Sequence, residues 1–345
     1  MDDGVTLARG FSRDVVEPLL GRELPGLRYA AGRLGSGSDV LGLDDATSRD
    51  HDWGCRLTVL VDEADAGVLP RLAEALDDLP ETYRGWPVRF ATTWDPVVRH
   101  KVELGTVGGF VRSRLGVGPQ LCTVDWLTVT GQAVLEVTAG PVFRDATREL
   151  GPARAALRWY PPQVERYLLA AGWQRVAQRM PMVGRIADRG QPLASRLLCG
   201  VLAGDLVQLA FLLCRRFAPY EKWREAALHR LPVGAALSGP LAAAVERDDW
   251  YQRETGLADA IAVLGAVQRE RGLPAVRVVP FFDRPYRTID ETVCADLLTG
   301  VTDPDLTGLP LVGSIEQWVD STDVLARPRN RPGAAAAYRA WLAAD

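Results

Sequence analysis

The chain has 345 residues and a mass of 37.6 kDa, enough for two packed domains or one large one. Hydrophobic residues make up 47% and charged residues 24%, and the formal charge of -4 argues against a strongly basic nucleic-acid groove. Five scattered cysteines without a C-x-x-C pair predict reduced thiols rather than a disulfide framework. The acidic N-terminus lacks the apolar segment of a signal peptide, and the most apolar run, 193–213, contains Arg196 and Asp205. We therefore expect a cytoplasmic protein that does not cross a membrane.

The first part of the chain has the pattern of an α/β domain. Hydrophobic periodicity predicts helices over 14–20, 66–79 and 108–115, and strands within 26–34, 51–61, 87–94 and 100–107. Side chains alternate between the faces of a strand, so the strand over 51–61 should have one apolar and one polar face. The apolar face would hold Trp53, Cys55, Leu57, Val59 and Val61, and the other face Asp50, Asp52, Arg56 and Thr58.

From about residue 150 the pattern becomes helical. Helices are expected from 164 onward and over 193–216, 221–231, 257–271 and 333–342, with an extended segment over 276–290. The fold class is therefore α/β (α+β), with a small mixed-sheet domain over 1–150. A mainly helical domain follows over 151–345, and its extended tail from about 273 is expected to pack back onto it.

The stretch "LGSGSDVLGLDDATSRDHDWG", residues 34–54, has more carboxylates than an ordinary turn before a strand needs. Asp50 and Asp52 are two positions apart, so on a strand their side chains project to the same side and could hold one metal site. Gly35 and Ser36 end the preceding strand, where small residues let the backbone approach phosphate oxygens. Carboxylates that hold Mg²⁺ and backbone donors that bind a polyphosphate are what nucleotidyl transfer needs.

A third carboxylate should come from a neighbouring strand. Glu103 is the candidate, because Val102 and Leu104 on either side should point into the core. An ordinary exposed acid is the alternative interpretation of Glu103, and Glu136, in a helical stretch, is a competing third carboxylate. Asp39, in the loop itself, could stabilise the loop through an Asx turn.

These motifs resemble the nucleotidyltransferase superfamily that includes kanamycin nucleotidyltransferase and the polymerase-beta-like enzymes. The shared signature is Gly-Ser, a spacer, and an Asp-x-Asp pair at the start of a strand. The resemblance extends to a branch recorded only as a domain of unknown function, on the segments "GSGSDVLGLDDATSRDHDWG", "HKVELGTVGGFVRSRLG", "AGPVFRD", "RRFAPYEKW" and "GSIEQWVDSTDVL". It implies a nucleotidyltransferase domain with a small mixed sheet, followed by a helical domain.

The resemblance also implies roles for residues that match the superfamily by position. A divalent metal, Mg²⁺ or Mn²⁺, would be held by Asp50, Asp52 and Glu103, which would also be the catalytic residues. Glu103 could act as ligand or as general base. The phosphates of ATP or another nucleoside triphosphate would be bound by Gly35, Ser36, Ser38, Lys222 and Arg216.

The leading functional hypothesis is a Mg²⁺-dependent nucleotidyltransferase that moves a nucleoside monophosphate, AMP from ATP, onto a hydroxyl of a small-molecule acceptor. The alternatives are a catalytically silent module that senses a nucleotide or binds a protein, and nucleotidyl transfer to a protein or an RNA. The acidic balance argues against a nucleic-acid partner. A homodimer is an open alternative to a monomer, because related antibiotic-modifying enzymes can build their site across a dimer.

Overall fold

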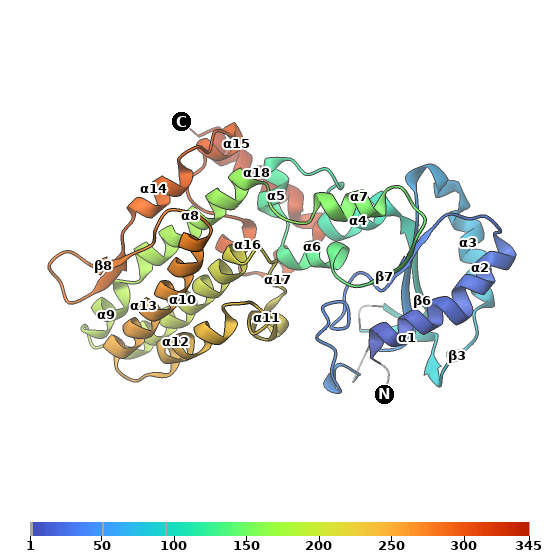
Figure 1. The fold of residues 1–345 in the computed structure, drawn as a ribbon, viewed down its shortest axis with the longest axis horizontal. Coiled ribbons are helices and arrows are strands. Elements are labelled where there is room, and N and C mark those ends of the chain that lie inside the picture. Colours follow the sequence, from blue (N-terminus) through green and yellow to red (C-terminus); the bar gives the residue numbers. More distant parts are fainter. Residues whose placement is uncertain (1–2, 50–51, 94, 345) are drawn as a thin grey trace. The chain divides into compact units, whose positions relative to one another are not determined.

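The computed structural model describes residues 3–49, 52–93 and 95–344, and the chain forms two compact units. Unit 1 consists of Met1–Leu121 and Gln132–Arg158, and unit 2 of Cys122–Gly131 and Trp159–Asp345. The chain thus leaves unit 1, contributes a short segment to unit 2, and returns to complete unit 1. Figure 1 shows the ribbon coloured along the sequence, with many of the elements labelled.

Unit 1 contains a five-stranded mixed sheet in the order β5-β6-β2-β1-β7. β2 runs parallel to β6, whereas the β5–β6, β1–β2 and β1–β7 pairs are antiparallel. The strands are β1 (Ala30–Gly32), β2 (Arg56–Val61), β5 (Arg89–Thr92), β6 (Asp95–Thr106) and β7 (Val142–Asp145), with a separate hairpin of β3 (Thr82–Tyr83) and β4 (Trp86–Pro87). The predicted mixed α/β fold, a small sheet followed by a largely helical region, is confirmed.

Helices complete unit 1. They are α1 (Gly4–Phe11), α2 (Glu17–Glu23), α3 (Leu69–Ala75), α4 (Val107–Leu115), α6 (Gly131–Thr138), whose first residue belongs to unit 2, and α7 (Leu150–Ala156). The helical segment at the N-terminus begins ten residues before the expected Asp14, at Gly4, where Asp3 caps α1 by accepting from Thr6 N. A π-helical segment, Ser12–Val16, joins α1 to α2.

The apolar face predicted for β2 is confirmed. Cys55, Leu57, Val59 and Val61 are buried in the core cluster of unit 1, and Trp53 packs against it. The strand itself begins at Arg56, so the predicted start at 51 is wrong. Asp52 has a left-handed backbone, with φ of 57°, and the chain therefore turns before the strand begins.

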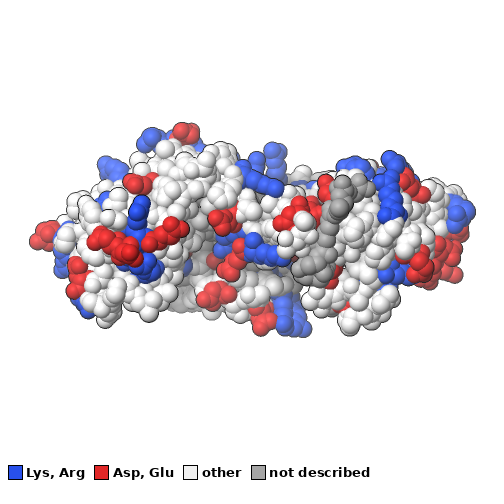
Figure 2. Space-filling view, turned by 90° about the horizontal axis from the view of Figure 1, so that it is seen from below, with Lys and Arg blue, Asp and Glu red and all other residues white. Residues whose placement is uncertain are grey.

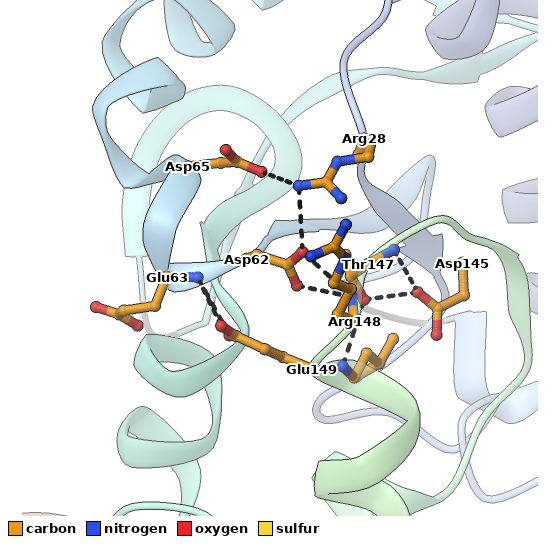
Figure 3. Close-up of polar contacts among 9 residues, drawn as sticks. Arg28, Asp62, Glu63, Asp65, Asp145, Thr147, Arg148 and Glu149 are labelled. Carbon is orange, nitrogen blue, oxygen red and sulfur yellow. Dashed lines mark hydrogen bonds and ion pairs between the residues drawn. The ribbon is translucent and has the colours of Figure 1, made fainter.

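The other end of β2 is tied to the connection between β7 and α7. Asp62 is buried, and its two carboxylate oxygens accept from Arg148 N at 2.9 and 3.2 Å, as Figure 3 shows. One residue further on, Glu63 N donates to both carboxylate oxygens of Glu149 at 3.2 and 3.1 Å. Backbone N–H donors thus satisfy both carboxylates, and these bonds fix the end of the strand.

Unit 2 is built mainly of helices. Its long helices are α8 (Pro162–Arg179), α10 (Pro192–Leu213), α12 (Gly234–Glu246) and α13 (Trp250–Glu270). The shorter ones are α5 (Thr123–Thr128), α9 (Met182–Ala187), α11 (Glu221–Leu228), α14 (Thr292–Leu298), α15 (Pro304–Thr307), α16 (Ile315–Trp318), α17 (Thr322–Leu325) and α18 (Arg331–Leu342). The segment expected to be extended forms the hairpin of β8 (Val278–Pro280) and β9 (Arg287–Ile289).

α10 is long and apolar enough to cross a membrane by length and composition alone, and 44% of its most apolar window is buried inside the protein. Core helices of globular proteins have the same property. The buried side of α10 packs in unit 2 through Cys199, Leu202, Leu206, Leu209 and Leu213. Arg175 and Arg179 of α8 form ion pairs with Asp205 near the middle of α10, at 3.0 and 2.9 Å. This charged contact is typical of a helix packed against other helices.

Acidic and basic side chains are interspersed on the face shown in Figure 2. This mixture agrees with the nearly balanced composition of 40 Lys and Arg against 44 Asp and Glu. Exposed ion pairs such as that of Arg196 with Asp248, at 2.9 Å, contribute little to stability because water screens them.

Candidate functional site

The glycine–serine loop follows β1 directly and depends on Gly35. Gly35 has a φ of +83°, and its N–H donates to Glu136 O of α6 at 2.8 Å. A Cβ at this position would lie 3.1 Å from Nη2 of Arg114, so the missing side chain lets the guanidinium sit against the loop. Gly35 therefore serves both the turn and the close approach of Arg114.

Arg33 braces the loop from inside. It is 2% exposed, and its guanidinium donates to Leu34 O and Ser36 O, each at 2.8 Å. Its Nε and Nη2 also donate to the two carboxylate oxygens of Asp39, at 2.6 and 2.8 Å. Two-point Arg–carboxylate bonds of this kind fix geometry as well as charge. Asp39 thus holds the loop by an ion pair with Arg33.

Ser38 takes part in the same loop through a different contact. Its hydroxyl donates to Asp44 Oδ1 at 3.3 Å, and the other oxygen of Asp44 accepts from Gly4 N at 2.9 Å. Asp45 accepts from Ser48 N at 2.8 Å. Asp44 and Asp45 therefore act as turn and capping residues, in agreement with the composition of the loop.

Arg56, the first residue of β2, extends toward the loop. Its Nη2 donates to Ser36 Oγ at 3.3 Å. The pKa of Arg56 is lowered to about 9: burial and the neighbouring Arg33 lower it, while Asp39, Asp52 and Glu103 act in the opposite direction. The guanidinium therefore remains charged at neutral pH and places a cation beside the loop.

Glu103 lies on β6 opposite Thr58 of β2 in the parallel register. Val102 is in the core cluster and Leu104 packs against it, which turns Glu103 to the other face, as expected. Arg114, in the last turn of α4, donates to both oxygens of Glu103 at 2.6 and 2.5 Å.

Glu136 reaches the same arginine from another element. Arg114 Nε lies 3.4 Å from an oxygen of Glu136, which is helical, as the sequence indicates. Burial raises the pKa of Glu136, whereas Arg114 and a hydrogen bond from Gln132 lower it. Both candidate third carboxylates, Glu103 and Glu136, are therefore bound to one guanidinium.

Asp52 lies before β2 and contacts the end of β5. Its Oδ1 accepts from Thr93 N at 2.6 Å and its Oδ2 from Thr93 Oγ1 at 2.8 Å. Asp50, the other half of the predicted pair, lies outside the described residues. Because the strand begins at Arg56, the predicted position of Asp52 on a strand face is wrong; Asp52 lies in a turn with a left-handed backbone.

The hydrogen bonds of Asp52 and Glu103 show whether their carboxylate oxygens are free to bind a divalent metal. Both oxygens of Asp52 accept from Thr93, and both oxygens of Glu103 accept from Arg114. Within 3–49, 52–93 and 95–344, no group of three or more His, Cys, Asp or Glu side chains is arranged to hold a metal ion. The predicted ligand set of Asp50, Asp52 and Glu103 includes Asp50, which lies outside the described residues, so this set stays a prediction. In the described part of the chain, Asp52 is bound by Thr93 and Glu103 by Arg114.

Lys222 and Arg216, the cations expected to bind the triphosphate, belong to unit 2. Both are exposed. Lys222 Nζ lies 5.2 Å from the centre of the Trp223 ring, and Arg216 Nη1 donates to Arg215 O at 3.2 Å. Their role at the phosphates stays a prediction.

Three arginines that organise this site were not among the residues expected to act in it: Arg33, Arg56 and Arg114. The sequence pattern places Arg56 on the polar face of β2. A cation close to a glycine–serine loop that could bind phosphate is the signal that could have identified it. Arg114 had no local signal, because its partners lie on β6 and α6 and meet it only in the folded chain. The loop, Arg56, Glu103 and Arg114 thus form one cluster of cations and carboxylates in unit 1.

The chain was compared with protein families, curated proteins and solved structures. No curated protein matches the chain. The crystal structure of a nucleotidyltransferase-like protein from Exiguobacterium sibiricum 255-15 is 13% identical, covers 82% of this chain and 98% of its own, and has a TM-score of 0.33. This TM-score is too low to establish a shared fold. Residues 126–224 match the family described as Domain of unknown function (DUF4037). Over these residues the chain is similar to that family, in agreement with its sequence resemblance to a branch recorded as a domain of unknown function.

Proposed function

We propose that the chain is a nucleotidyltransferase that transfers a nucleoside monophosphate, AMP from ATP, onto a hydroxyl of a small-molecule acceptor. One observation carries this proposal: the glycine–serine loop, Arg56 and Glu103 come together at one place in unit 1. Gly35, Ser36 and Ser38 would face the phosphates through the loop, and Arg56 would neutralise one of their charges.

The reaction is a substitution at phosphorus. The acceptor oxygen forms a bond to the α-phosphorus, the bond from that phosphorus to the α–β bridging oxygen breaks, and pyrophosphate leaves with that electron pair. The hydroxyl proton passes to a base, for which Glu103 is the described candidate. A divalent ion, Mg²⁺ or Mn²⁺, would supply charge stabilisation when bound, and Asp50 and Asp52 are the residues proposed to hold it.

A second candidate function is nucleotide sensing without transfer. It is favoured by the contacts of Asp52 with Thr93 and of Glu103 with Arg114, which already satisfy both carboxylates. In a sensor, the arginines would bind the triphosphate and no metal would be needed for chemistry. Transfer to a protein or an RNA remains an alternative for the enzyme.

The deciding experiment measures ATP binding and pyrophosphate release on the same sample. Thermal unfolding is followed with ATP, with and without Mg²⁺, and pyrophosphate is then assayed in the presence of a metabolite extract. Stabilisation that requires Mg²⁺, followed by release, supports the transferase. Stabilisation with no release under any acceptor supports the sensor, and no stabilisation by any nucleotide contradicts both.

A further inference from the structure

A cluster of charged side chains in unit 2 contains buried donors without acceptors. Arg331, the first residue of α18, is 2% exposed. Its Nη2 donates to Leu325 O at 2.9 Å and to Thr130 Oγ1 at 3.3 Å. Its Nε and Nη1 are buried and have no hydrogen-bond partner in the part of the chain that the structure describes. Leaving such donors unpaired is costly, so they call for an acceptor.

The Nε of Arg224, on α11, is also buried and has no hydrogen-bond partner among the described residues. Glu316 of α16 interacts electrostatically with both arginines. Glu316 Oε2 accepts from Gly131 N at 2.9 Å. Its carboxylate thus bonds to a backbone N–H and does not satisfy the unpaired guanidinium donors. Two guanidinium groups with unpaired donors therefore lie within electrostatic reach of one carboxyl group.

We propose that Arg331, Arg224 and Glu316 form a binding site in unit 2 for a phosphate group carried by a small ligand. The unpaired donors belong to two side chains on different helices, so they can surround an acceptor from more than one direction. A tetrahedral phosphate offers oxygens in several directions, whereas a carboxylate offers two oxygens in one plane. With two cations and one acid, the cluster favours an anion.

The state of Glu316 supports this site. Burial raises the pKa of Glu316, and the N–H of Gly131 and the two arginines oppose this effect. A bound anion would favour the protonated carboxyl group further, and this group could then donate to a phosphate oxygen. Glu316 and Arg224 are partly exposed to solvent, whereas Arg331 is buried. The site lies in unit 2 and does not depend on the proposed transferase activity.

Internal water could satisfy the same donors, and a phosphate titration distinguishes the two cases. Inorganic phosphate is titrated into the full chain at constant ionic strength, with chloride and acetate as comparison anions, and binding is followed by calorimetry and thermal unfolding. We expect saturable binding of phosphate that acetate and chloride do not reproduce. Absence of saturable phosphate binding overturns the proposal and leaves water as the acceptor.

Variants locate the binding. Arg224→Gln is expected to weaken phosphate binding about tenfold, because it removes one charged hydrogen bond. Arg329→Gln, an exposed arginine of the segment before α18, removes the same charge and should leave the affinity unchanged. Equal affinity in Arg224→Gln and in the unsubstituted chain overturns the site.

Glu316→Gln gives a second, independent readout. Phosphate affinity of the unsubstituted chain should fall as pH rises and Glu316 loses its proton, whereas the Gln variant should lack this part of the pH dependence. This variant keeps the test valid if Arg331→Gln, which changes a buried residue, fails to fold. A pH profile that is the same for both chains contradicts the placement of the phosphate beside Glu316.

Discussion

Arg114 donates from Nη2 to both carboxylate oxygens of Glu103, at 2.6 and 2.5 Å. The two residues come from the end of α4 and from β6, so the contact exists only when the helix packs on the sheet. It neutralises the acid that is the best described candidate for catalysis. A divalent ion bound near Glu103 would have to compete with this guanidinium.

The first prediction concerns this competition. Arg114→Gln should increase the affinity of the chain for Mn²⁺ about tenfold, because it removes a positive charge a few ångströms from the carboxylates. Mn²⁺ binding is measured by electron paramagnetic resonance without nucleotide. The matched control is Arg112→Gln on the same helix, whose guanidinium pairs with Glu63 at 3.6 Å and should leave Mn²⁺ binding unchanged. Unchanged affinity in Arg114→Gln would show that no metal binds beside Glu103.

The second prediction tests Asp52. Asp52→Asn should reduce transfer roughly 100-fold or more if this carboxylate takes part in catalysis. The unfolding free energy should change by about 1 kcal/mol, because Asn tolerates a left-handed backbone and retains an oxygen for Thr93 N. Transfer is measured by pyrophosphate release, and stability by urea denaturation.

Thr93→Val separates the two roles of Asp52. It removes the hydroxyl that donates to Asp52 Oδ2 at 2.8 Å but leaves the carboxylate charge in place. We expect this variant to keep most of the transfer activity. If Asp52→Asn retains full turnover, the catalytic role of Asp52 is excluded.

The third prediction concerns the loop brace. Arg33→Gln should lower the unfolding free energy by about 3–5 kcal/mol, because it leaves Asp39 without its buried partner and frees two carbonyl groups of the loop. Chemical denaturation measures the loss. Arg28→Gln removes a more exposed arginine that pairs with Asp65 at 3.2 Å, and should cost less than about 1 kcal/mol. Equal losses in the two variants would contradict the bracing role.

The fourth prediction is a pH dependence that arises in unit 2. Burial alone would raise the pKa of Glu165, but hydrogen bonds from Arg215 and Trp159, with Arg271, outweigh burial and lower it from 4.5. A carboxyl group with a lowered folded-state pKa stabilises the protein above its unfolded-state pKa of about 4.5, and this contribution is lost as pH falls through the folded-state pKa. Stability should therefore fall on acidification below about pH 4.5.

Glu165→Gln tests this dependence. Urea denaturation between pH 3 and 7 should show a smaller acid-induced loss in Glu165→Gln than in the unsubstituted chain, together with lower stability at neutral pH. Glu221→Gln, at an exposed position of α11, is the control and should follow the unsubstituted chain. Parallel pH curves for Glu165→Gln and the unsubstituted chain would exclude Glu165 as the source.

The sequence predicts the sheet of unit 1 better than its site. The alternation of Cys55, Leu57, Val59 and Val61 identifies the buried face of β2, because a strand with one buried face must repeat every two residues. The same rule, extended to Asp52, fails. A left-handed residue ends the alternation before the strand begins, and only the folded backbone shows this.

Long-range contacts explain the other differences. Arg114 meets Glu103 and Glu136 from three separate elements, and no local pattern in the sequence encodes that meeting. α12 lies outside the helices predicted from the sequence. It contains Pro240, which disfavours a helix locally, and packing against α13 stabilises it. The general position of the glycine–serine loop could be predicted, since small residues after a strand and acids before the next are a local signal.

The discontinuity of unit 1 has a consequence for synthesis on the ribosome. β1 pairs on one side with β2 and on the other with β7, with Ala30 opposite Asp145. A nascent chain that has reached residue 121 holds β1 and β2 but not β7, so one edge of β1 has no strand to bond. The sheet can be completed only after the segment Gln132–Arg158 leaves the exit tunnel. Stalled or truncated chains would therefore present an open strand edge, and chaperones that bind such edges would recognise them.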